Sequence, residues 1–241
     1  SSTVITNIVL PSTVTHIDQY AFAYSGNLKD IEFPSGLEQI GPYAFENCLF
    51  EEVDIPDSVT KLASNAFINC TKLSTVGYPA EWTECYYQIG DEYYDGYSAN
   101  RTPFYGCTSL KEITVDEGVT SIPKYAFRNM ASLETINLPE SLTTISAYAF
   151  DGCTKLSATW IPASVTDIKY YAFNNCTSLI IHSEEDSYAQ EYAETNNIPF
   201  STEKLTYESS TISGRVVDES SDAIESVSVS VYDFTAKKFV T

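Results

Sequence analysis

Four carboxylates recur at matching places in two successive segments, and this spacing is the first feature that could do chemistry. Asp30 and Glu32 come four and two residues before a proline, and Glu52 and Asp54 stand in the same relation to the next such proline. If the segments are neighbouring strands, these side chains lie on one side, where they could hold a cation. No Asp- and Gly-rich calcium loop accompanies them. The pattern therefore favours a solvated acidic face, and we expect no bound metal.

The two histidines, His16 and His182, are too far apart to act together. In the repeat array described below they are about six rungs apart, roughly 29 Å at the spacing of neighbouring strands. The sequence also contains no Gly-x-Ser-x-Gly, His-Glu-x-x-His or Cys-x-x-Cys motif and no phosphate-binding glycine loop. In so acidic a chain, a catalytic carboxylate pair of the glycosidase type is the alternative interpretation. A shallow repeat face, however, offers no water-excluding pocket for such a pair. We expect no enzyme activity and no cofactor.

Residues 80–102 are rich in aromatic side chains, which can stack on a sugar or a peptide when exposed. Residues 85–89 and 92–97 flank Gly90 and Asp91 and could pair as a hairpin. Two interpretations are open. The rings form a protruding ligand-binding platform, since long insertions are often functional, or the hairpin packs them back onto its neighbours. The aromatic residues are Trp82, Tyr86, Tyr87, Tyr93, Tyr94 and Tyr97.

Trp160 stands two residues before a proline, where Glu32 and Asp54 stand in their own segments. A tryptophan on an exposed strand row is a candidate binding hot spot. Contact with the end of the array explains it equally well. The predicted ligand-binding residues are therefore the six insertion aromatics together with Trp160, Glu32 and Asp54.

The elements that position these residues come from a repeat of about 23 residues. Each copy has an alternating stretch that predicts a short strand with one buried side, and then usually a proline. A second short extended segment and a tight helical or 3₁₀ turn complete it. One copy buries too little to fold alone, so stacking must supply the core. One step is 37 residues, 14 more than 23, which marks an insertion in the fourth copy. The seven copies end at Phe22, Phe45, Phe67, Phe104, Phe127, Phe150 and Phe173.

Five of the six cysteines follow a repeat phenylalanine by three residues, which places them in the predicted core. Cysteines of adjacent copies would be parallel and about 4.8 Å apart, whereas a disulfide needs converging Cβ atoms about 3.8 Å apart. We therefore predict a ladder of buried thiols without disulfides. Cys85 is out of this register and is the one candidate for an exposed thiol. The five are Cys48, Cys70, Cys107, Cys153 and Cys176.

The shared pattern I/L-P-x-S-V-T-x-I-x-x-x-A-F-x-x-C-x-x-L resembles the BspA-like, or Treponema-type, leucine-rich repeat family over about three quarters of the chain. The resemblance implies a leucine-rich repeat solenoid, a curved right-handed α/β horseshoe that is rich in β-structure. It also implies a bacterial origin and display at the cell surface or secretion. Members of the family are reported as adhesins that bind host matrix proteins or other bacteria.

The predicted domains are residues 1–201, a seven-repeat solenoid with a short C-terminal capping helix, and residues 204–241. Ser187 with Gln190 makes a capping box, an apolar stripe follows, and an Asn-Asn pair suits the end of the helix. Residues 204–241 alternate like two antiparallel strands. They resemble the opening of a carboxypeptidase-regulatory-like or immunoglobulin-like domain, and they are too short for an independent sandwich. We interpret them as part of a longer protein.

The 241 residues include 33 acidic and 13 basic side chains, a net charge of -20. This charge repels phosphate backbones and anionic lipids, so nucleic acid and membrane are not expected partners. We expect a monomeric, extracellular bacterial binding protein whose ligand is a protein or glycan. It would bind through the concave repeat face and the aromatic insertion. The alternative is a structural spacer, or an accessory module of a larger surface protein or carbohydrate-active enzyme.

Overall fold

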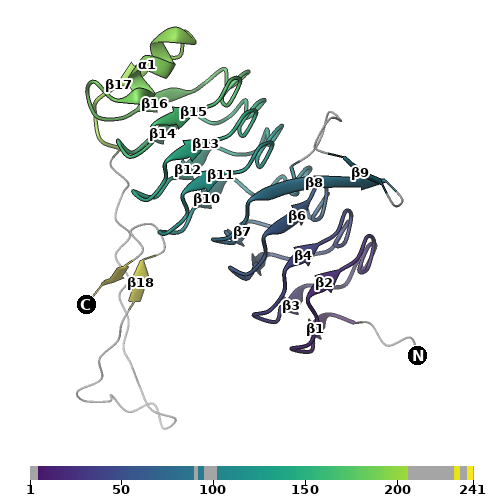
Figure 1. The fold of residues 1–241 in the computed structure, drawn as a ribbon. Coiled ribbons are helices and arrows are strands. Elements are labelled where there is room, and N and C mark those ends of the chain that lie inside the picture. Colours follow the sequence, from purple (N-terminus) through teal and green to yellow (C-terminus); the bar gives the residue numbers. More distant parts are fainter. Residues whose placement is uncertain (1–4, 90–91, 95–101, 206–230, 234–237, 241) are drawn as a thin grey trace, which may run out of the picture. The chain divides into compact units, whose positions relative to one another are not determined.

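The computed structural model describes residues 5–89, 92–94, 102–205, 231–233 and 238–240. The chain divides into two units, Ser1–Lys204 and Leu205–Thr241. The first unit is a solenoid of stacked coils (Figure 1). In the second unit, β18 (Val231–Asp233) and β19 (Lys238–Val240) pair as antiparallel strands. The likeness of this segment to an immunoglobulin-like domain stays a prediction.

Coils of the solenoid contribute short parallel strands to two rows. The first row consists of β1 (Asn7–Val9), β3 (Asp30–Glu32), β5 (Glu52–Asp54), β7 (Thr75–Gly77), β10 (Glu112–Thr114), β12 (Thr135–Asn137), β14 (Ala158–Trp160), β16 (Ile180–His182) and β17 (Phe200–Ser201). The second row consists of β2 (His16–Ile17), β4 (Gln39–Ile40), β6 (Lys61–Ala63), β8 (Glu84–Ile89), β11 (Ser121–Ile122), β13 (Thr144–Ile145) and β15 (Asp167–Ile168). β9 (Glu92–Tyr94) pairs with β8 in the insertion. The predicted solenoid is thus confirmed.

The strands follow the alternation of the sequence. In β3, Ile31 is 8% exposed and lies between the exposed side chains of Asp30 and Glu32. Its backbone neighbour in β1 is Ile8, so like residues stack on like from coil to coil. Successive side chains of a strand point to opposite sides. Every second side chain therefore faces the core, and those between them face solvent.

The bend of every coil except the fourth contains two residues in the left-handed region, and this excludes a helix there. In the second coil, Tyr43 has a φ of 58° and Asn47 a φ of 59°. Phe45 lies between them and is fully buried. Hydrogen-bonded turns such as Glu46 N to Tyr43 O, 3.2 Å, carry the chain around. The helical or 3₁₀ turn expected from the sequence is therefore wrong, because left-handed residues on both sides of the phenylalanine break the helical path.

The repeat phenylalanines stack face to face inside the bends. Neighbouring ring centroids are 5.4 Å apart for Phe22 and Phe45 and 5.0 Å apart for Phe150 and Phe173, with nearly parallel planes. Such stacked aromatic pairs add to the free energy of burial. The core is therefore one continuous column rather than a set of separate clusters.

Both strand rows are interrupted between the fourth and fifth coils. In the described residues of the first row, β7 and β10 lie side by side but form no ladder. In the second row, β8 pairs with β9 of the insertion instead of with β11 of the next coil. At this junction Phe127 contacts Tyr78 and Trp82, at centroid distances of 6.3 and 6.0 Å. Side-chain packing therefore replaces backbone pairing here.

The cysteines form the predicted ladder, and none of the six, all of which lie in described residues, is in a disulfide. Each of the five ladder thiols donates to a carbonyl of the preceding coil, as Cys70 does to Phe45 O (3.1 Å) and Cys153 to Phe127 O (3.1 Å). The prediction for Cys85 is wrong. It is 8% exposed, because it occupies the inward position of the second strand row next to Leu62.

We expect native thiols to react slowly with a disulfide reagent, with Cys176 first because it alone is partly exposed. Burial raises the pKa of the Cys48 thiol from 9.0 to about 12, so little reactive thiolate is present near neutral pH. Above pH 9 the Cys48 thiol loses its proton in the unfolded chain but keeps it in the folded chain. Its contribution to the free energy of unfolding is therefore lost as the pH rises from 9 to about 12. Timed labelling with mass spectrometry checks the order, and six equally fast thiols would contradict it.

The predicted capping helix is present as α1 (Tyr188–Thr195) at the C-terminal end of the solenoid unit. Gln190 N donates to the hydroxyl of the N-cap residue Ser187, at 3.2 Å. Ala189, Tyr192 and Ala193 are buried, and the Tyr192 ring packs against Phe173. The helix thus covers the apolar end of the last coil, as repeat arrays require.

Candidate ligand-binding site

The outward side chains of the first strand row form one extended surface, here called the strand face. The pairing registers align these side chains in two columns within each of three paired stretches, β1 with β3, β5 with β7, and β10 through β16. The first outward position of the successive strands is held by Asn7, Asp30, Glu52, Thr75, Glu112, Thr135, Ala158 and Ile180, and the second by Val9, Glu32, Asp54, Gly77, Thr114, Asn137, Trp160 and His182.

The N-terminal part of the strand face is acidic and open to solvent. Glu32 and Asp54 are both exposed. Asp54 lies against Gly77 of the next coil, where a Cβ atom would collide with its carboxylate. Asn7 donates to Asp30 at 3.2 Å. No group of three His, Cys, Asp or Glu side chains in the described part of the chain could hold a metal. This acidic region is therefore available for contacts with a partner.

Trp160 lies at the C-terminal part of the strand face and is partly exposed. It is paired in register with His182, whose Nδ1 is 2.7 Å from the carbonyl oxygen of Glu203. The ammonium of Lys204 stands 5.6 Å from the centre of the Trp160 ring. The ring thus contacts the segment after β17 and keeps exposed surface, and its role as a binding hot spot stays a prediction.

The structure corrects the predicted aromatic platform at Trp82 and Tyr86, which are 1% and 0% exposed. Trp82 Nε1 donates to Glu84 O at 2.9 Å. The Tyr86 hydroxyl accepts from Gln39 Nε2 at 2.8 Å, and burial raises its pKa. These side chains are inside because the regular coil continues through Tyr86, which pairs with Ala63. The extra residues begin after it, so both rings are excluded from a surface site.

The predicted hairpin is confirmed, since β8 and β9 pair with Tyr87 opposite Tyr94 and Gln88 opposite Tyr93. Tyr97 lies outside the described residues. The ligand-binding role of Tyr87, Tyr93, Tyr94 and Tyr97 stays a prediction.

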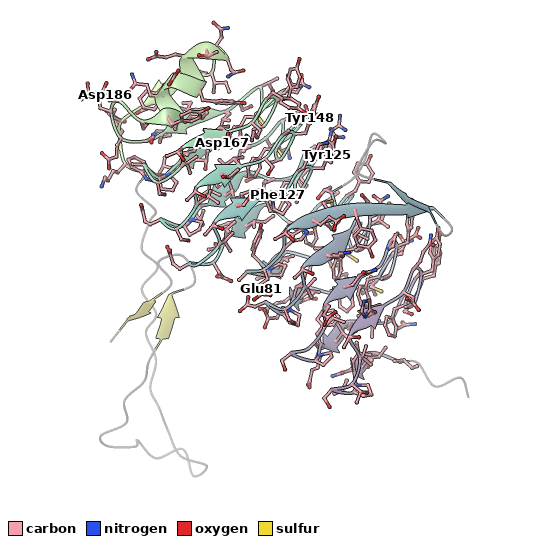
Figure 2. All side chains as sticks on the ribbon, viewed as in Figure 1. Glu81, Tyr125, Phe127, Tyr148, Asp167 and Asp186 are labelled. Atoms are coloured by element: carbon pink, nitrogen blue, oxygen red, sulfur yellow. The ribbon has the colours of Figure 1, made fainter. Side chains whose placement is uncertain are left out.

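Sequence reasoning missed a row of tyrosines on the bends, two residues before the repeat phenylalanines. Their rings stack from coil to coil, at 5.0 Å for Tyr20 and Tyr43 and 5.4 Å for Tyr125 and Tyr148. Figure 2 shows Tyr125 and Tyr148 at the same edge of neighbouring coils. The signal was present in the repeated Tyr-Ala-Phe triplets. We call this surface the tyrosine edge.

Two parallel strand rows around one column of core side chains define this protein as a repeat solenoid of the leucine-rich type. The family model described as the BspA type leucine rich repeat region matches residues 1–92 and 98–213 in six copies. The chain belongs to this family. No helix within the described residues has the length and apolar character needed to cross a bilayer.

Two solved bacterial structures, from Eubacterium ventriosum and T. pallidum, show the same fold. A leucine-rich repeat protein from Eubacterium ventriosum is 30% identical with a TM-score of 0.56, over 70% of this chain and 42% of its own. The Leucine Rich Repeat protein of T. pallidum is 21% identical with a TM-score of 0.55, over 83% and 86%. One from Bacteroides ovatus is 23% identical with a TM-score of 0.45, over 74% and 55%. The chain thus spans about half of the first and last of these. No curated protein gave a significant match.

Proposed function

We propose that this chain is a non-catalytic binding module of a bacterial protein that is displayed at the cell surface or secreted. It recognises an extracellular protein or glycan through the strand face, with the insertion hairpin as a second contact. One observation carries the proposal, namely that Glu32, Asp54 and Trp160 occupy the same outward position in their strands of the first strand row. Eight strands at about 4.8 Å give a face roughly 34 Å long. A surface of that length suits a macromolecular partner.

The environments of the histidines support binding rather than catalysis. His16 is exposed and its Nδ1 is 2.8 Å from the hydroxyl of the neighbouring Thr15. His182 is engaged by the backbone carbonyl of Glu203. The Thr15–His16 pair is exposed to solvent rather than held in a water-excluding site, so it does not support catalysis. Extracellular display is proposed because the relatives are bacterial repeat proteins of this family.

A second candidate function is a spacer or accessory module within a larger protein. The observation that favours it is the 42% coverage of the Eubacterium ventriosum protein, which is considerably longer than this chain. If the chain is a spacer, no substitution on the strand face or at the hairpin tyrosines should change ligand binding. Binding on a glycan array without binding to matrix proteins favours an accessory module of a carbohydrate-active enzyme.

The test is binding of the purified chain to immobilised extracellular-matrix proteins and to a glycan array. We expect at least one specific interaction, weakened about tenfold or more by Trp160→Ala, since central aromatic residues dominate interface energies. The variant E32K/D54K should slow association with a basic partner, because charge complementarity acts mainly on the association rate.

The matched control is E185K/E191K, which makes the same charge change at exposed positions near or on α1. It should leave binding within about twofold. If all three variants bind as the parent does, the strand face is not the site. Absence of any interaction on both panels would favour the spacer.

A further inference from the structure

Three tyrosines at the C-terminal end of the tyrosine edge form a corner. The rings of Tyr148 and Tyr171 stack at 5.3 Å with planes 30° apart. The ring of Tyr170 stands at 89° to both, at 5.6 Å from Tyr148 and 5.7 Å from Tyr171. Tyr170 is 61% exposed and Tyr171 53%. Two large aromatic side chains therefore remain open to solvent beside a third.

The same edge already receives cations from the chain itself. The guanidinium carbon of Arg128 is 5.6 Å from the ring centre of Tyr125 and 5.4 Å from that of Tyr148. Lys124 Nζ stands 4.7 Å from the Tyr125 ring centre. These distances are in the range where a ring face attracts a cation. The tyrosine edge is thus a surface on which an arginine side chain packs in this fold.

The arginines of the bends end with Arg128, which still contacts Tyr148. Arg128 follows its repeat phenylalanine directly, and the same position in the next two coils holds Asp151 and Asn174, which carry no positive charge. The ammonium of the nearby Lys169 is paired with Asp167 at 2.7 Å. Tyr170 and Tyr171 therefore have exposed rings and no arginine from the equivalent position.

We propose that the exposed rings of Tyr170 and Tyr171 bind an arginine side chain of a basic partner protein, as the rings of Tyr125 and Tyr148 bind Arg128. The net charge of -20 attracts a basic partner and repels a second copy of this chain. This surface shares no residue with the strand face, so the proposal does not depend on the function proposed above.

The probe is a short peptide, acetyl-Gly-Arg-Gly-Arg-Gly-amide, titrated into the full chain and followed by NMR of the tyrosine rings and by calorimetry. An analogue with citrulline in place of arginine keeps the shape and removes the charge. We expect the arginine peptide to bind and the citrulline peptide to bind about tenfold more weakly or not at all. Equal binding of both peptides would overturn the proposal, as would binding of methyl glucoside in place of the arginine peptide.

The variant Y170A/Y171A keeps the net charge, so it separates ring contacts from general attraction by an acidic chain. We expect it to lose about tenfold in affinity for the arginine peptide, while Y170F/Y171F keeps its affinity because the rings remain. Tyr20→Ala is the matched control, since Tyr20 is equally stacked and 51% exposed but Gln19 stands where Tyr170 stands. An unchanged affinity in Y170A/Y171A, or an equal loss in Tyr20→Ala, contradicts an arginine receptor at the corner.

Discussion

Replacing Trp82 with alanine should lower the free energy of unfolding by about 3–5 kcal/mol, the range for removing a large aromatic side chain from a core. Trp82 is 1% exposed and packs against Tyr78 and Phe127. The position of Trp82 at a junction between two coils means that the substitution also affects how the coils unfold together. At the junction between the fourth and fifth coils, neither strand row of the described residues has ladder pairing, so side-chain packing joins the coils there. We therefore also expect the variant to unfold in two steps rather than one.

Urea denaturation followed by far-ultraviolet circular dichroism measures both effects. The matched control is Trp160→Ala, which removes the same side chain from a partly exposed position and should cost about 1 kcal/mol or less. If Trp82→Ala unfolds within about 1 kcal/mol of the parent, Trp82 does not hold the junction. Hydrogen exchange in β10 and β11 then shows which coils separate first.

Asp151→Ala is expected to destabilise the chain by about 1.5–3 kcal/mol, because it removes a buried carboxylate and the charged hydrogen bonds that it accepts. The carboxylate is 6% exposed and lies 2.8 Å from Arg128 Nε. It also accepts from Asn174 Nδ2 at 2.8 Å and Asn175 Nδ2 at 3.1 Å. One side chain thus links three successive coils. The effect should be smaller than for a fully buried pair, since Arg128 is 23% exposed.

Asp167→Ala is the matched control for this second prediction. Asp167 forms an ion pair with Lys169 at 2.7 Å, but its side chain is 37% exposed and that of Lys169 52%. Exposed pairs contribute about 0–1 kcal/mol, so its loss should be barely measurable. Thermal unfolding of the two variants side by side gives the comparison. Equal stabilities would show that the links from Asp151 to the neighbouring coils do not matter.

The repeat made most of the fold predictable, because each inward position is repeated in several copies. Ile31 and Phe45 are buried as the alternation and the Ala-Phe ending indicate. The bend was harder, since Tyr43 and Asn47 adopt left-handed backbone angles that few side chains other than glycine favour. A tyrosine in that position gives no local sequence signal for a turn, so a helical turn was expected instead.

The candidate site was predicted less well, and Trp82 and Cys85 show why. They follow Pro79 by three and six residues, the two inward positions of every copy, yet the excess length nearby suggested that they belonged to the insertion. Their burial shows that the periodic pattern after the proline was the stronger evidence. The tyrosine corner depends on ring geometry between two coils, which spacing alone does not determine.

The most direct test of the proposed binding role uses the only two tryptophans of the chain. Hydroxyl-radical footprinting with mass spectrometry reports the oxidation of Trp160 and of buried Trp82 in the same sample, with and without the matrix protein or glycan that binds. We expect oxidation of Trp160 to fall several-fold at saturation while Trp82 stays protected throughout. Unchanged oxidation of Trp160 in the saturated complex would contradict binding through the strand face.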